Sequence, residues 1–177
     1  MRTAFPCIFV LALFLTGSAV ASAQVVSKYT NLSTKACKER KSTDEEGTSY
    51  EGECPGLAGY KLKLLEGDLR QSIDVVTPAK KIYQLAFWNI SSAFSHLGEK
   101  AEWRMRGRMP IALIFRFNAS EDPENTEKHT SYLVVAKVTK NEICVTDVVK
   151  PGPTQNLDAR KAADGSATRP CRKVDSP

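Results

Sequence analysis

The feature that most limits the fold of this chain is the placement of apolar side chains at every second position in several segments between residues 60 and 149. A period of two is typical of β-strands that bury one face and expose the other. Alternation on both sides of Gly67-Asp68 predicts a hairpin formed by residues 60–65 and 69–75. The strongest predicted strand is 111–117, in which one face is shared by Ile111, Leu113, Phe115 and Phe117.

The segment that follows the hairpin has two different patterns. Residues 82–88 are apolar at nearly every position, which predicts a strand covered on both faces. Ser91 or Ser92 then predicts the cap of one short helical turn, which runs through Leu97 and closes at Gly98.

The rest of the chain completes a mainly β domain. A short helix is expected over residues 157–164, capped by Asn156 and ended by Gly165. We therefore predict a single antiparallel sandwich or open barrel of about six to eight strands with this short C-terminal helix. The further strands are expected over residues 101–109, 132–139 and 143–149.

The N-terminus has the pattern of a cleaved secretory signal. Met1-Arg2 is a short positive start, residues 5–20 are largely apolar, and Ala21-Ser22-Ala23 provides the small residues that a signal peptidase reads. The apolar stretch is shorter than the ~20 residues of a membrane span, so we expect cleavage before Gln24, with an uncleaved anchor as the alternative. The predicted parts are a signal peptide (1–23), a polar N-terminal arm (24–49) and a β domain with the C-terminal helix (50–177).

Size and composition suit one exported domain. The chain has 177 residues, of which 42% are hydrophobic, enough for one core. These values argue against a wholly disordered, collagen-like, coiled-coil or multi-span membrane protein, and no transmembrane segment is expected after signal cleavage. We predict a periplasmic or secreted location.

Four cysteines remain after Cys7 leaves with the signal, an even number in an oxidising compartment. Three pairings are possible, and proximity in sequence favours Cys37–Cys54 and Cys144–Cys171. On the chain-entropy estimate these two disulfides would contribute about 3 and about 3.5 kcal/mol to stability. A zinc site is the weaker alternative, because the sequence contains no CxxC pair.

The candidate ligand-binding residues are three arginines and two tryptophans. Arg104, Arg106 and Arg108 alternate along a predicted strand, with Lys100 and Arg116 as possible neighbours. Three like charges on one face need either acidic cross-strand partners or a bound anion, such as a carboxylate or a phosphate. Aromatic residues around the predicted helical turn predict either a pocket or ordinary core packing, and we take Trp88 and Trp103 as the apolar contacts of the site.

Catalytic, metal and nucleotide motifs are weak. His96 and His129 could each act as a base, for example Ser92 with His96, but no GxSxG elbow is present. The acidic loop around residues 121–124 could hold calcium, although a solvated loop is the simpler interpretation. We therefore predict no catalytic residues, no metal ligands and no cofactor. A net charge of +5 gives no argument for nucleic-acid binding.

Three short segments carry a resemblance. With Cys54-Pro55-Gly56, the run from Leu97 to Arg104, and Ile143-Cys144-Val145, the chain resembles a group of uncharacterised proteins exported by Gram-negative bacteria, over about residues 29–171. This resemblance implies a periplasmic location and no particular activity.

These observations rank three functions. The leading one is a non-enzymatic periplasmic or secreted β domain that binds an envelope component, a small anionic ligand or a protein partner. The alternatives are a small secreted hydrolase that uses His96 or His129 as a base, and a structural envelope protein.

Overall fold

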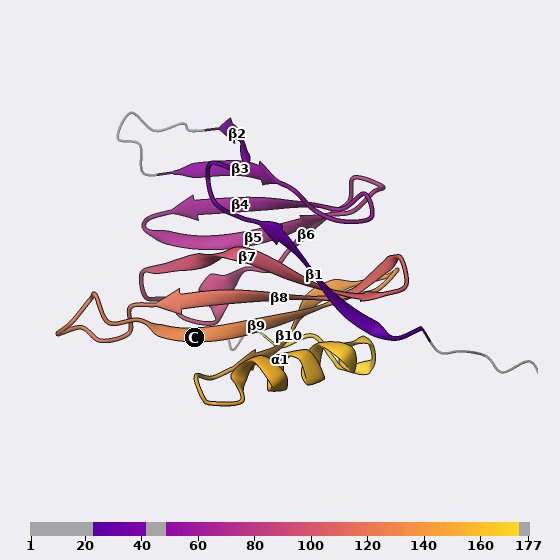
Figure 1. Cartoon of the computed structure of the whole chain (residues 1–177). Coiled ribbons are helices and arrows are strands. Elements are labelled where there is room, and N and C mark those ends of the chain that lie inside the picture. Colours follow the sequence, from indigo (N-terminus) through magenta and orange to yellow (C-terminus); the bar gives the residue numbers. More distant parts are fainter. Residues whose placement is uncertain (1–22, 42–48, 174–177) are drawn as a thin grey trace, which may run out of the picture.

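The computed structural model describes residues 23–41 and 49–173, so the predicted signal peptide, apart from Ala23, lies outside the described residues. One ten-stranded sheet is followed by helix α1 (Gln155–Asp164), as Figure 1 shows. Two short 3-10 helices, η1 (Phe87–Asn89) and η2 (Ser166–Thr168), complete the elements. The strands are β1 (Val25–Asn31), β2 (Lys38–Lys41), β3 (Tyr50–Cys54), β4 (Lys61–Gly67), β5 (Arg70–Val76), β6 (Ile82–Gln84), β7 (Ser95–Arg106), β8 (Met109–Ala119), β9 (Thr130–Val138) and β10 (Ile143–Val149).

The sheet is open and bends about a narrow junction. Its strand order is β10-β9-β8-β7-β5-β4-β3-β2, while β1 pairs with β7 and β6 pairs with β5. All strand pairs are antiparallel except β5 with β7, which share one parallel pair, Arg70 with Ser95. The predicted mainly β class, with an open antiparallel sheet and one short C-terminal helix, is confirmed.

The predicted hairpin is β4 and β5. Gly67 pairs with Arg70, so the loop between the strands has two residues, Asp68 and Leu69. Both have positive φ angles, 51° and 56°, as a type I′ hairpin turn requires. This turn sets the register that buries Leu62 and Leu64 on the core side of the sheet.

The principal core lies between the two halves of the sheet. Side chains from β4 and β5 meet those from β7, β8 and β9, and the ring of Phe87 packs edge-on against Phe115 and Phe117. Of the face predicted for residues 111–117, Leu113, Phe115 and Phe117 are fully buried, whereas Ile111 is half-buried. The fully buried side chains from both halves include Leu62, Ile73, Val75, Trp103, Leu113, Phe115, Phe117 and Val134.

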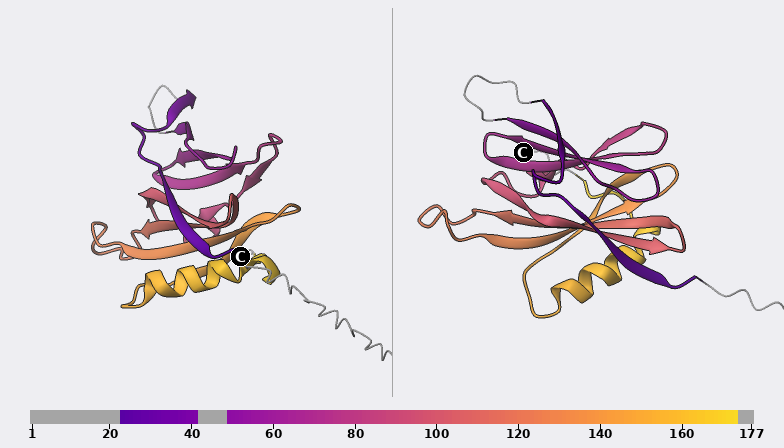
Figure 2. Two further views of the ribbon diagram at one scale, coloured as in Figure 1. Left: turned by 45° about the vertical axis from the view of Figure 1, so that its right-hand side comes forward. Right: turned by 45° about the horizontal axis from the view of Figure 1, so that its top comes forward.

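A second, smaller core joins α1 to the opposite face of β8 and β9, which we call the helix face. Three alanines of the helix, Ala159, Ala162 and Ala163, allow a close approach to the sheet. They pack against Ala112, Ile114, Leu133 and Val135. Figure 2 shows α1 lying along these strands, with β1 crossing the sheet diagonally. Because both faces are covered, the central strands β8 and β9 are apolar at most positions.

Both predicted disulfides are present, Cys37–Cys54 and Cys144–Cys171. The second one ties the segment after α1 to β10, and the backbone N–H of Arg172 donates to the carbonyl of Val145 at 2.7 Å. The same pairing leaves none of these four cysteines as a free thiol for the zinc alternative. No helix in the described part of the chain is long and apolar enough to cross a bilayer.

The predicted polar arm contains two strands. β1 pairs with β7 over seven residues and β2 pairs with β3, so most of residues 25–41 belong to the sheet. The alternation in β1 was obscured because it has one strand neighbour and its side chains are only half-buried or exposed. An edge strand of this kind does not need the apolar content that marks a central strand.

The strand predicted for residues 82–88 is confirmed only over residues 82–84, and the helical turn predicted to run through Leu97 was wrong. The apolar run forms the three-residue strand β6 and then η1, because Ala86 has a left-handed backbone, with φ of 47°. Residues 95–97 begin β7 instead of ending a helical turn. Strand pairing over many residues outweighs a local cap signal.

The C-terminal helix was predicted correctly apart from its cap. Thr154, not Asn156, occupies the N-cap position, and Gly165 follows the last helical residue as predicted. The Thr154 hydroxyl donates to the Asp158 carboxylate at 2.7 Å, so it stabilises the first turn through a side chain.

Candidate functional site

Arg104, the first of the three predicted arginines, is a structural residue. It is 8% exposed, and its guanidinium donates to both oxygens of Asp164 at the end of α1, each at 2.7 Å. A third bond goes to the Ser27 hydroxyl on β1. The hydrogen bond to Asp164 raises the pKa of Arg104. A guanidinium held on three sides in this way connects β1, β7 and α1 and has no face left for a ligand.

Arg106 shares the strand face of Arg104, because β1 pairs with both in one register, whereas Arg108 lies beyond the end of β7. β7 ends at Arg106, which pairs with Met109 across a tight turn. Gly107 has φ of 61°, and Arg108 lies beside it in the turn. Both arginines are exposed. The predicted arginine row is therefore divided between a buried ion pair and an exposed hairpin tip.

The two tryptophans also lie in different surroundings. Trp103 is fully buried in the principal core, where its indole N–H donates to the Thr30 hydroxyl at 2.9 Å. Trp88 lies on η1 and is 46% exposed. The predicted site that joined Trp88, Trp103 and the three arginines is therefore not formed by this fold.

A groove of about 460 Å³ opens on the helix face instead, between β1, the start of β7 and α1. Its origin is an irregularity in β7. Leu97 pairs with Phe117 and Ala101 with Phe115, so β7 contains two more residues than β8 between these pairs. The extra length at residues 98–100 bulges away from regular pairing. A Cβ at Gly98 would lie 3.0 Å from the Cβ of Arg116, so a larger residue there would displace Arg116.

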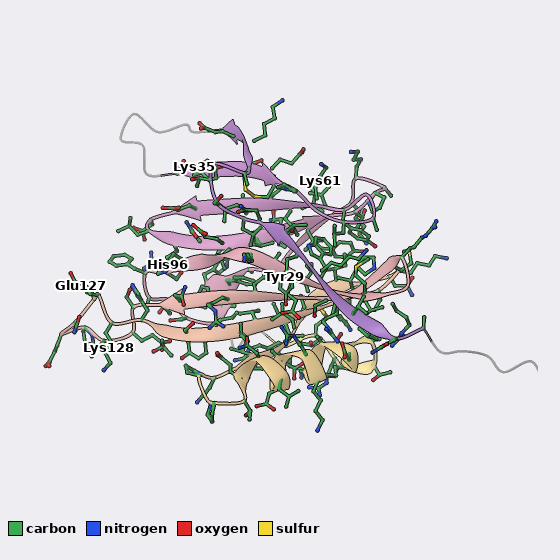
Figure 3. All side chains as sticks on the ribbon, in the orientation of Figure 1. Tyr29, Lys35, Lys61, His96, Glu127 and Lys128 are labelled. Atoms are coloured by element: carbon green, nitrogen blue, oxygen red, sulfur yellow. A yellow bond between two sulfur atoms is a disulfide. The ribbon has the colours of Figure 1, made fainter. Side chains whose placement is uncertain are left out.

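The floor and walls of the groove differ in chemistry. Ile114 and Leu133 line it from the sheet, and Tyr29, which is 51% exposed, lines it from β1. Figure 3 shows Tyr29 near the middle of the molecule, above α1. Polar side chains surround this apolar surface, namely those of Glu99, Lys100, Glu102, Arg116, Asn156 and Arg160.

Two of the groove's charged groups neutralise each other. Arg160 of α1 donates to both oxygens of Glu102, at 2.7 and 3.2 Å, and also to the hydroxyl of Tyr29. Burial raises the pKa of Glu102, but hydrogen bonds from Arg160 and Ser27 outweigh it and hold that pKa below its usual range. Glu102 is therefore an ionised carboxylate already paired with Arg160.

Arg116 and Lys100 are the cations left without a carboxylate partner. Arg116 donates to two neutral oxygens, the Ser131 hydroxyl at 2.8 Å and the Gln155 amide oxygen at 3.4 Å. Lys100 is exposed and makes no ion pair within residues 23–41 and 49–173. The exposed Glu99 lies on the same lining. Both cations were named in the sequence as neighbours of the arginine row, but Gly98, which lies at the β7 bulge, was interpreted as the end of a helical turn.

The two histidines lie together at the far end of the helix face. Their ring centroids are 4.8 Å apart in a T-shaped arrangement, and the Ser120 hydroxyl lies 2.9 Å from Nδ1 of His129. The serine that contacts a histidine is thus Ser120, not Ser92. Burial and then the neighbouring His129 lower the pKa of His96.

This lowered pKa predicts a loss of stability in acid. The unfolded chain protonates His96 near pH 6.5, while the folded chain resists protonation. The stability that neutral His96 contributes is complete above that pH and is lost as the pH falls through the pKa of His96 in the folded chain. Because the ring is exposed and screened by water, we expect a loss below ~1 kcal/mol. Urea unfolding at about pH 7.5 and about pH 5.5 measures this loss of stability, and His96→Gln should abolish the loss. Equal pH dependence in both proteins would contradict this assignment.

Two carboxylates of the acidic loop, those of Glu121 and Asp122, accept hydrogen bonds from nearby residues. Asp122 accepts from Lys128 at 3.2 Å and from the backbone N–H of Glu124, and Glu121 accepts from the Tyr132 hydroxyl. Within the described ranges, three potential metal-ligating side chains come together only at Glu142, Cys144 and Cys171. The two cysteines there form a disulfide. The calcium alternative therefore gains no support from this loop.

Comparison with known proteins found no family model, no curated protein and no solved structure that matches this chain. The resemblance to exported Gram-negative proteins stays a prediction from the sequence. Function must consequently be argued from the groove and its charges.

Proposed function

We propose that this protein is a non-catalytic binding domain of the periplasm or the secreted fraction, and that it holds a small organic anion in the groove beside α1. The observation that carries this proposal is the pair of cations, Arg116 and Lys100, that line the groove without a carboxylate partner. A bound carboxylate or phosphate supplies the charge that the protein itself does not.

The shape and lining of the groove support a ligand with an apolar part. Its volume of about 460 Å³ lies within the usual range for small-molecule sites. Ile114, Leu133 and the ring of Tyr29 offer apolar contacts beside the cations. The ligand class is therefore an anionic head attached to an apolar or aromatic body, either free or as part of an envelope component.

The proposed location is supported by the two disulfides. Disulfides persist in oxidising compartments and are rare in the cytosol. The predicted signal peptide points in the same direction.

The hydrolase alternative has one observation in its favour, the contact between Ser120 and His129. A catalytic serine normally needs a base that is itself oriented by a third group, most often a carboxylate. In the part of the chain that the structure describes, no carboxylate contacts either histidine. A binding function is therefore preferred.

Phenyl phosphate is a suitable probe, because it joins a phosphate to an aromatic ring. In an NMR titration of the mature chain, we expect shifts in the amides around Gly98, Lys100 and Arg116. Arg116→Gln should weaken binding about tenfold or more, because a charge-assisted hydrogen bond contributes about 1.5–3 kcal/mol. Lys100→Gln should act in the same direction with a smaller effect, because Lys100 is exposed and water screens its charge.

The matched control is Arg106→Gln with Arg108→Gln, which removes two exposed cations outside the groove. Binding in this control should equal that of the unchanged protein. The proposal fails if the Arg116→Gln, Lys100→Gln double variant binds as well as the unchanged protein, or if the control loses binding to the same extent. If the proposal holds, native mass spectrometry of protein purified from its own cell envelope identifies the natural ligand by its mass.

A further inference from the structure

The fold brings together two imidazoles that are far apart in the sequence. His96 is the second residue of β7 and His129 immediately precedes β9. Their ring centroids lie 4.8 Å apart. Figure 3 shows His96 near one end of β7, on the side of the molecule where the loop with Glu127 and Lys128 projects. The spacing of the histidines in the sequence matches no metal motif, so only the fold reveals this pair.

Strand pairing fixes where the two rings are. His96 pairs with Asn118 across β7 and β8, and Ala119 pairs with Thr130 across β8 and β9. The backbone N–H of Ser120 donates to the carbonyl of Phe94 at 2.9 Å, which holds the end of β8 against the start of β7. His96 therefore lies on paired backbone, and His129 lies directly before the first paired residue of β9.

One ring also has a defined orientation. The Ser120 hydroxyl is hydrogen-bonded to Nδ1 of His129 at 2.9 Å, which leaves Nε2 of that ring for another partner. A hydrogen bond to one ring nitrogen is the usual way in which proteins orient a metal-binding histidine and set its tautomer. Both histidines are exposed, so a solvated ion can reach them.

The surroundings of the pair suit a cation. The nearest loop lysine, Lys128, is paired with Asp122 at 3.2 Å. Imidazole nitrogens favour a borderline metal ion over calcium or magnesium, which prefer oxygen ligands.

We propose that His96 and His129 form a site for a divalent transition-metal ion, with water completing an open coordination sphere. Imidazole ligands bind Cu²⁺ more tightly than Zn²⁺ or Ni²⁺, so Cu²⁺ is the preferred ion. Ser120 is a positioning residue that acts through Nδ1 of His129. This site is separate from the anion groove and does not depend on the function proposed for it.

The test is a titration of the mature, disulfide-bonded chain with Cu²⁺ alone near neutral pH, read by calorimetry and by electron paramagnetic resonance. We expect one equivalent of Cu²⁺ with the hyperfine pattern of two nitrogen ligands. His96→Ala and His129→Ala should each weaken binding by more than about tenfold, since each removes a ligand. Ser120→Ala should weaken it by about tenfold while keeping the two-nitrogen pattern, which a merely structural role would not predict.

Glu127→Ala is the matched control, because it changes a charge on the same loop without touching either ring. It should leave Cu²⁺ affinity unchanged. If an alanine variant lowers the unfolding temperature, His96→Gln or His129→Gln is used in its place, because glutamine is closer in size to histidine. The proposal is overturned if no Cu²⁺ binds, if the double histidine variant binds Cu²⁺ as tightly as the unchanged chain, or if the spectrum shows no pair of nitrogen ligands.

Discussion

Replacing Trp103 by alanine is expected to lower the free energy of unfolding by about 3–5 kcal/mol, the usual cost of removing a buried aromatic side chain. Trp103 is fully buried, packs near the ring of Tyr60 at 6.2 Å and donates to Thr30. Its removal leaves a cavity and an unpaired hydroxyl at the junction of β1 and β7. Urea denaturation at constant pH measures this loss.

Trp88→Ala is the natural comparison, because Trp88 is the other tryptophan that the sequence assigned to a binding site. Its side chain is 46% exposed on η1. We expect the change in stability to stay within about 0.5 kcal/mol, as for most surface positions. Equal losses for the two variants would show that Trp103 does not have the packing described above.

Arg104→Ala is expected to cost about 3 kcal/mol, because it leaves Asp164 without its partner in a largely enclosed place. This value is at the lower end for a buried ion pair, since 37% of the Asp164 side chain is exposed and water screens its charge. The loss should persist in high salt, which screens exposed pairs far more than buried ones. Urea denaturation in low and high salt provides the measurement.

Arg106→Ala and Arg108→Ala test the same row of arginines at its exposed end. Both side chains are exposed, and their loss should change the free energy of unfolding by less than about 0.5 kcal/mol. If Arg104→Ala were as mild as these two variants, its bonds to Asp164 and Ser27 would not hold α1 and β1 to the sheet.

The elements that sequence predicted well are those whose signals are local. Gly67-Asp68 fixes a hairpin because a two-residue turn needs positive φ angles and its flanking strands alternate. The strand around Phe115 was evident because β8 is central and strongly apolar. The disulfides followed from proximity along the chain, and Cys37–Cys54 and Cys144–Cys171 are indeed the pairs formed.

The candidate site could not be predicted in the same way, because it depends on contacts between distant segments. Alternation correctly predicted that Arg104 and Trp103 lie on opposite faces of β7. It could not show that α1 brings Asp164 to Arg104. The groove needs the bulge at Gly98, which is defined only by its pairing with β8. The meeting of His96 and His129 likewise depends on the register of three strands.

The pairing of β1 with β7 has a consequence for how the chain reaches this structure. Ser27 of β1 bonds to Arg104 of β7 across 77 positions of the sequence. A ribosome releases β1 first, so this strand stays unpaired until most of the domain has been made. Strands that are distant in the sequence pair slowly, so the sheet is completed late. This side of the sheet therefore stays incomplete until β7 has been made and has folded.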